Sequence, residues 1–360
     1  MKSYGSKIQK TLLATALLSL SVSPAYAAKV TDKLEISGKA FLGLHSNKVE
    51  NFSSATQTTT VKSNTTGATV DRFYLQAKYH LNDQWYGRIT TDVNNETKVG
   101  LKRNTNVFLK YAYVEGKLND ALQVRLGLSH TPWIDYEQKL WKHRYIAKVY
   151  SDFFKFDDSA DYGVGLKGKA LDKMVEYWFT YTNGGGYGKP NASQAMDVNG
   201  RLTVHPIKGM DISAGFRSGY RGKKLLATVN PTKEDMNQVM ISHGTKTWRV
   251  GANFLTRTKK NNVSTTQTDS GYTAWAWANF GEYGVFGRYD YMKSTPFGGA
   301  TSAKTVHYVA GVEYFATKGM NIALALDTSR VTNGNDTWKF TATGDTSKST
   351  KIGLYSQFKF

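Results

Sequence analysis

Many short segments of the chain alternate apolar and polar side chains, and arginine or lysine stands at the polar positions of these segments; this spacing gives the first indication of chemistry. Alternate side chains of an extended chain share a face, so the basic groups of one segment point the same way. Guanidinium and ammonium groups bind anions, and arginine grips phosphate through two parallel hydrogen bonds. The basic residues with this spacing are Arg72, Lys78, Arg88, Arg125, Lys167, Arg201, Arg217, Arg249 and Arg288.

Carboxylates occupy the same faces of these segments, at Asp92, Asp161, Asp197, Asp211, Asp290 and Glu313. Two interpretations stay open. The excess of basic groups, nine against six, favours a surface that selects anions, because rings of Arg and Lys select for them. Alternatively, the arginines are neutralised by these acids and only stiffen the wall that carries them.

Catalytic chemistry is not indicated. The seven histidines are His45, His80, His130, His143, His205, His243 and His307, and none has a His-x-x-x-His or Glu-x-x-His spacing. Ser129 and His130 are neighbours, but neighbours in a strand point to opposite faces and cannot form a nucleophile–base pair. The "GGGYG" string lacks the Lys-Ser/Thr that ends a phosphate-binding loop. We expect no enzyme, no metal and no cofactor.

The segments that carry the basic groups read as β-strands. Residues 33–44, 72–81, 122–129, 175–181, 210–217 and 248–254 alternate apolar and polar side chains, which is strand periodicity. The chain has 22 Tyr, 17 Phe and 8 Trp but only 6 Pro, and strands favour aromatic residues and reject proline. A soluble β-sandwich would have polar outer faces, whereas here the aromatic residues share faces with the aliphatic ones.

The connections alternate between short and long. Seven short turns alternate with eight long polar stretches, which are 46–69, 95–105, 131–159, 184–193, 220–233, 257–269, 294–303 and 331–347. Fifteen connections require sixteen strands, including a strand over 234–243, whose alternation is poor and which the even count requires. This pattern is typical of bacterial outer-membrane barrels. It predicts an all-β fold, a sixteen-stranded antiparallel transmembrane β-barrel with short periplasmic turns and long extracellular loops.

The first 27 residues predict export. "MKSYGSKIQK" is basic, "TLLATALLSLSV" is a short apolar run, and small residues stand at Ala25 and Ala27. The run is too short to span a membrane, so we expect a signal peptide over 1–27, cleaved after Ala27. The barrel then comprises residues 28–360.

The last residues, "LYSQFKF", continue the alternation to the end. A closed barrel has no free edge, so this strand must pair with the first one. Phe358 and Phe360 resemble the membrane-assembly signal of outer-membrane proteins, which implies contact with the barrel-assembly machinery. We expect Phe360 at the periplasmic rim.

The net charge of +19 raises the question of nucleic acid. Nothing in the chain looks like a recognition helix, and an exported barrel does not normally meet DNA, so nucleic acid is excluded. The absence of cysteine excludes disulfides and thiolate metal sites.

Three stretches resemble the sixteen-stranded porins of Gram-negative bacteria, in a layout similar to phosphate-selective porins: "RLGLSHTPWIDYE" (125–137), "TNGGGYGKP" (182–190) and "FGEYGVFGRYDY" (280–291). The resemblance implies a water-filled channel in a homotrimer, with the third long loop, about 131–159, folded inward. It also implies localisation in the outer membrane.

The sequence of the third loop predicts a short amphipathic helix over 132–145. Thr131 suits the N-cap and Pro132 the first helical position, while Lys142, His143 and Arg144 lie late, as the helix dipole favours. We expect the helix to pack on the inner wall, narrow the channel and present these three side chains to solutes. The alternative is a helix that caps the outer rim.

The sequence therefore predicts a porin for passive diffusion of small hydrophilic solutes, with a preference for anions that extends to phosphate or other oxyanions. The alternative is a non-conducting structural or adhesive barrel. Basic residues on the long loops could gather anions or bind lipopolysaccharide phosphates: Lys62, Lys98, Lys102, Arg103, Lys223, Lys224, Lys259 and Lys260.

Overall fold

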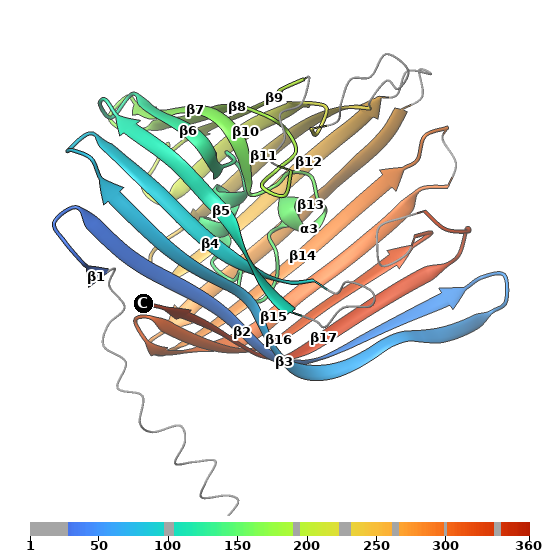
Figure 1. Cartoon of the computed structure of the whole chain (residues 1–360). Helices are drawn as coiled ribbons and strands as arrows, with labels where there is room; N and C mark the ends of the chain where they lie inside the picture. Colours follow the sequence, from blue (N-terminus) through green and yellow to red (C-terminus); the bar gives the residue numbers. More distant parts are fainter. Residues whose placement is uncertain are drawn as a thin grey trace, which may run out of the picture.

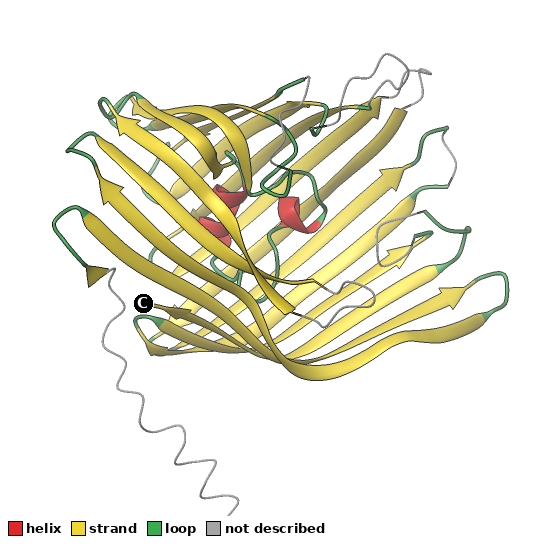
Figure 2. Ribbon diagram, viewed as in Figure 1, coloured by secondary structure: helices red, strands yellow, loops and turns green. Residues whose placement is uncertain are grey.

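The computed structural model describes residues 28–96, 104–189, 195–222, 232–260, 266–298, 301–334 and 340–360. The expected signal peptide over 1–27, with its cleavage site after Ala27, lies outside the described residues, as do Lys98, Lys102, Arg103, Lys223 and Lys224. The described chain is mostly strand (Figure 2).

Its elements in chain order are β1 (Ala28–Lys29), β2 (Leu34–Ser53), β3 (Thr58–His80), β4 (Trp85–Glu96), β5 (Asn104–Lys117), β6 (Gln123–His130), α2 (Ile134–Trp141), α3 (Tyr150–Phe153), β7 (Ala160–Ala170), β8 (Val175–Thr182), β9 (Asp197–Val204), β10 (Met210–Gly219), β11 (Lys233–Gly244), β12 (Trp248–Lys260), β13 (Thr266–Phe280), β14 (Tyr283–Thr295), β15 (Ala303–Thr317), β16 (Met320–Thr332) and β17 (Thr346–Lys359).

Strands β2 to β17 form a closed antiparallel barrel of sixteen strands (Figure 1). Each strand pairs with its neighbours in the chain, and β17 pairs with β2 from Thr346↔Phe52 to Lys359↔Lys39. Closure leaves every wall strand with a partner on both sides, which a membrane-spanning sheet requires. The short β1 adds two residues alongside β2. The predicted fold class is confirmed.

Alternate side chains divide the wall into two faces. The outer face is apolar, and Leu44, Leu126 and Ile352 are each more than half exposed. The buried polar side chains, among them Arg201 and Asp290, belong to the opposite face. An apolar outside and a polar inside is the distribution of a barrel in lipid. Within the described ranges, no helix is long and apolar enough to cross a membrane.

The segment over 234–243 is a strand, as the even count required. Strand β11 covers it, and it pairs with β10 through ten residues and with β12 through twelve. The prediction of a loop over 46–69, in contrast, is wrong. Strands β2 and β3 continue through it and pair from Leu34↔Tyr79 to Ser53↔Thr58, leaving a turn over 54–57. The resulting hairpin extends at the lower right of Figure 1. Its run of Thr, Ser and Asn looked like a loop because it is polar, yet β-branched threonine favours strands.

Candidate permeation pathway

Six of the predicted arginines are bound to carboxylates inside the barrel. The pairs are Arg72–Asp92 at 2.8 Å, Arg125–Glu115, Arg201–Glu176 at 2.5 Å, Arg217–Asp197 at 3.2 Å, Arg249–Asp211 at 2.5 Å and Arg288–Asp290 at 3.0 Å. Lys167 shares Glu115 at 3.0 Å, and Lys78 lies 3.9 Å from Glu35. Buried charges need such partners to offset their desolvation. These six arginines are therefore neutralised by acids of the wall, which is the second of the two interpretations of the sequence.

Arg88 on β4 is the exception. No carboxylate oxygen lies within 4.0 Å of its guanidinium among the residues that the structure describes. Its Nε–H donates to Thr90 Oγ1 at 3.0 Å and its Nη1–H to the hydroxyl of Tyr113 at 3.4 Å. The guanidinium carbon lies 5.0 Å from the ring centroid of Tyr111. All these partners are neutral, so Arg88 keeps an uncompensated positive charge.

Residues 131–159 lie inside the barrel, where Figure 2 shows both short helices. Trp133 and Ile134 are fully buried. The Tyr136 hydroxyl donates to Asp211 at 2.9 Å, and Trp277 Nε1–H donates to the carbonyl oxygen of Leu140 at 2.9 Å. The indole of Trp133 occupies the space that a side chain at Gly215 would need, because a Cβ there would lie 2.1 Å from it. The helix therefore packs against the inner wall.

The helix itself is shorter than the expected 132–145. It spans Ile134–Trp141, and Lys142 follows in the left-handed conformation with φ 65°. The Thr131 hydroxyl does not cap the helix but donates to the carbonyl oxygen of Asp158 at 2.6 Å. A second helix, α3, begins at Tyr150. The apolar side chains of 145–150 are buried in the barrel interior, whereas Lys148 is exposed, and sequence spacing alone did not indicate this.

Of the three side chains expected to face solutes, Lys142 is exposed, whereas His143 is buried. His143 Nε2 lies 2.9 Å from Glu313 Oε1 and its Nδ1 lies 2.8 Å from the carbonyl oxygen of Trp141. Arg144 is paired with Asp152 at 3.3 Å. His143 thus fastens the loop to β15, and it lines the inner cavity together with Lys142 and Arg144.

Glu137 connects α2 to Ser151 on α3 and to the inner face of β12. Its carboxyl group is fully buried and contacts the hydroxyl of Ser151 and the side-chain amide of Asn253 on β12. Burial raises the pKa of Glu137 to about 7. The hydrogen bond from Ser151 and the charge of Arg288 oppose that shift without cancelling it.

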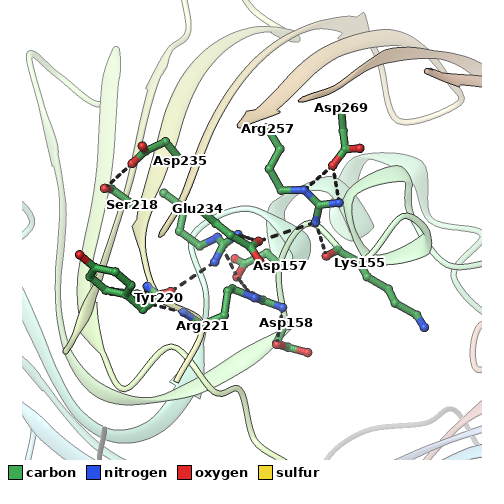
Figure 3. A network of polar contacts seen from close by, with 12 residues as sticks. Lys155, Asp157, Asp158, Ser218, Tyr220, Arg221, Glu234, Asp235, Arg257 and Asp269 are labelled. Atoms are coloured by element: carbon green, nitrogen blue, oxygen red, sulfur yellow. Dashed lines mark hydrogen bonds and ion pairs between the residues drawn. The ribbon is translucent and has the colours of Figure 1, made fainter. Parts of the chain in front are cut away.

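The end of the loop is held by the polar network of Figure 3. Arg221 binds Asp157 at 3.3 Å and Asp158 at 2.9 Å, while Arg257 donates to the carbonyl oxygen of Lys155 at 3.0 Å. The guanidinium of Arg217 lies 3.9 Å from Asp157 and 3.3 Å from Glu234. Burial raises the pKa of Asp157 to about 6, although the positive charges of Arg217 and Arg221 act to lower it.

A cavity of about 960 Å³ lies between the third loop (131–159) and the end of the barrel that carries the short turns, here called the turn end. Five cations that line it have no ion-pair partner in the described part of the chain: Lys39, Arg88, Lys142, Lys318 and Lys359. Of its lining carboxylates, Asp135 is bound to Lys139 at 3.0 Å and Glu313 to His143. Glu282 is the one lining acid with no cation partner among the described residues. The cavity is therefore positively charged.

Sequence reasoning found Arg88 and Lys142 but missed Lys39, Lys318 and Lys359. A usable signal was present. The last strand was expected to pair with the first, and that pairing brings Lys359 opposite Lys39. Lys318 stands in the adjacent turn, where the carbonyl oxygen of Gly319 accepts the backbone N–H of Lys359 at 2.8 Å. No group of three His, Asp or Glu side chains in the described ranges could hold a metal ion.

The C-terminal Phe360 lies at the turn end, on the seam between β17 and β2. Its backbone exchanges hydrogen bonds of 2.7 and 3.1 Å with Gly38, and its ring lies over that glycine. The rings of Phe358 and Phe360 stack with centroids 5.5 Å apart.

No protein-family model matches the sequence, and no curated protein matches it either. Solved structures do match the fold. The outer membrane channel DcaP of Acinetobacter baumannii is 10% identical with a TM-score of 0.63, covering 94% of this chain and 100% of that one. An anion-selective porin from Comamonas acidovorans is 12% identical with a TM-score of 0.61, covering 91% and 100%. OmpT of Vibrio cholerae is 10% identical with a TM-score of 0.60, covering 92% and 99%.

These similarities show the fold, a closed antiparallel β-barrel like those of outer-membrane proteins. More specifically, it has the fold of the sixteen-stranded outer-membrane porins, as the three sequence stretches implied.

Proposed function

We propose that this protein is a porin in the outer membrane of a Gram-negative bacterium. It forms a water-filled channel through which small hydrophilic solutes diffuse passively, and it acts as a channel and not as an enzyme. Two observations support this function. The fold is that of outer-membrane porins, and a cavity of about 960 Å³ that several charged side chains line lies inside the barrel.

The proposed channel prefers anions. The single observation that carries this preference is the set of five cations that line the cavity without a carboxylate partner in the described chain. Paired arginines on the wall contribute little net field, whereas unpaired cations attract anions directly. Phosphate and other oxyanions belong to the proposed solute class, since ammonium and guanidinium groups bind them.

The other expectations stay within this proposal. The chain is exported by the signal peptide over 1–27 and assembles as a homotrimer, and a trimer form of one protein with a similar fold, OmpT of Vibrio cholerae, supports this assembly. Phe358 and Phe360 act as the assembly signal, and the basic loop residues bind lipopolysaccharide. The predicted side chains on the inner wall line the channel, with Asp92 and Asp290 holding their arginines.

Planar lipid bilayers test whether the protein conducts. Discrete conductance steps from the purified, folded protein would support the porin function. The absence of any conductance from folded protein would support the structural or adhesive barrel. Deleting residues 134–144 tests the constriction. We expect a larger single-channel conductance, because α2 and Lys142 leave the channel. An unchanged conductance would show that the loop does not narrow the path.

A further inference from the structure

Three of the unpaired cations in the cavity lie over aromatic rings. Lys142 Nζ lies 3.7 Å from the ring centroid of Trp277, and the guanidinium of Arg88 lies 5.0 Å from that of Tyr111. Lys39 Nζ lies 5.8 Å from the ring of Phe41. An aromatic face attracts a cation through its quadrupole and carries no net charge. A ring therefore holds a cation in place without neutralising it, which a carboxylate cannot do.

Lys142 shows this arrangement most clearly, because its backbone and its aromatic partner are linked. Trp277 is buried on the inner face of β13, and its Nε1–H donates to the carbonyl oxygen of Leu140 at 2.9 Å. Two residues further on, the backbone N–H of Lys142 donates to the carbonyl oxygen of Gln138 at 2.9 Å. The loop backbone and the ring beneath the ammonium group are therefore fixed relative to each other.

The other groups around the Lys142 ammonium do not hold it. Partial burial of its ammonium group lowers the pKa of Lys142, and the like charges of Arg249 and Lys359 lower it further. Glu313 is the nearby acid that favours the charged form. Its two oxygens already contact His143 and the Tyr145 hydroxyl, each at 2.9 Å. The Trp277 ring is thus the group that contacts the Lys142 ammonium directly, and it stabilises the ammonium while carrying no negative charge of its own.

We propose that Trp277 is a positioning residue that sets anion selectivity by holding the Lys142 ammonium in the cavity. This inference rests on the proposed anion preference, and it adds that selectivity depends on the ring as well as on the charge. The solutes concerned are small anions that pass the Lys142 ammonium, with chloride as the simplest probe.

The test compares chloride-over-potassium permeability ratios from reversal potentials in planar bilayers. In Trp277→Leu we expect the ratio to fall roughly two- to fivefold, the change that loss of a cation–π contact produces. Trp277→Phe keeps an aromatic face but lacks the N–H donor, and it should restore most of the ratio. Trp275→Leu is the matched control, since Trp275 is buried on the same strand and packs on Trp141 instead of a cation. That variant should keep the wild-type ratio.

A second comparison separates positioning from general damage. In a Lys142→Gln background, adding Trp277→Leu should cause no further fall, because the ring then has no cation to hold. The inference is overturned if Trp277→Leu keeps the wild-type ratio, if Trp277→Phe loses as much as Trp277→Leu, or if the two substitutions add independently. A wild-type channel without chloride preference is a different failure. It contradicts the proposed anion preference before any variant is made.

Discussion

Lys39 and Lys359 stand directly opposite each other across the β2–β17 ladder that closes the barrel. Like charges directly opposite in an antiparallel pair are destabilising. The nearby carboxylate of Asp135 is bound to Lys139 and does not pair with either of them. Apart from Arg88, the arginines predicted on the inner wall have acidic partners. Two opposed, unpaired lysines at the β2–β17 ladder therefore point to a role in the cavity at a cost to stability.

Replacing one of the two should therefore separate function from stability. Lys359→Gln is expected to lower the chloride preference. It should also leave the free energy of unfolding unchanged or raise it by about 0.2–1 kcal/mol, because a repulsion is removed. Reversal potentials and heat-denaturation midpoints in detergent check the two effects. Lys348→Gln is the control, since Lys348 is exposed on the same strand and does not line the cavity. A Lys359→Gln channel with wild-type selectivity would contradict this account.

Arg88 and Arg72 should respond in opposite ways to the same substitution. Arg88→Gln removes a cation with neutral partners, so we expect a clear loss of chloride preference and little loss of stability. Arg72→Gln leaves Asp92 buried without its cation, and breaking such a pair costs about 3–5 kcal/mol. The melting midpoint and the permeability ratio of each variant provide the comparison. Equal loss of selectivity in both would mean that paired arginines also govern permeation.

Docking of the third loop should weaken as the pH rises. Burial raises the pKa of Glu137 from 4.5 to about 7 and that of Asp157 from 3.8 to about 6. A carboxyl group whose pKa is raised in the folded state stabilises that state when protonated, and this contribution is lost as pH rises through the folded value. The window is therefore about pH 4 to 7, with a change of up to about 3 kcal/mol for Glu137.

Amide hydrogen exchange over residues 134–153, corrected for intrinsic rates, measures that change. The groups facing Glu137 are Ser151 on the loop, Asn253 on β12, and Arg288 and Asp290 on β14. Protection should be higher at about pH 5 than at about pH 8, and Glu137→Gln should reduce the difference. Protection that rises with pH would reverse the sign and exclude Glu137 as the cause.

Closure of the barrel should depend on the contact between Phe360 and Gly38. A side chain at Gly38 would lie 2.0 Å from the Phe360 ring, so Gly38→Val must displace that ring from its place over the glycine. Deleting Phe360 removes both backbone hydrogen bonds to Gly38. The folded fraction, measured by heat-modifiable mobility in detergent gels, should fall in both variants. Gly87→Ala, where nothing lies within 4 Å of the new Cβ, should fold normally.

The strands could be predicted because their signal is local. Alternation fixed the faces of residues such as Leu354 and Tyr355, and alternating connection lengths gave the strand count, including β11. The hairpin over 46–69 was missed because polar composition was taken as a loop, although hydrogen bonding to β17 on one side continues as far as Phe52. Polarity does not distinguish a loop from a strand that extends beyond the lipid.

The site was less predictable because ion pairing depends on register and on the loop. Sequence spacing put Arg125 and Arg201 on the inner face, but their partners Glu115 and Glu176 come from neighbouring strands and were not identified. The burial of His143 follows from a contact with Glu313, which is 170 residues away. Such contacts exist only once the barrel is closed and the loop is inside it.

The reversal potential of the wild-type protein in a planar bilayer under a KCl gradient tests the central claim most directly. The account predicts a reversal potential directed towards that of chloride, because five cations in the cavity lack acidic partners in the described chain. A reversal potential directed towards that of potassium would contradict it, and would mean that the carboxylates of the inner wall dominate permeation.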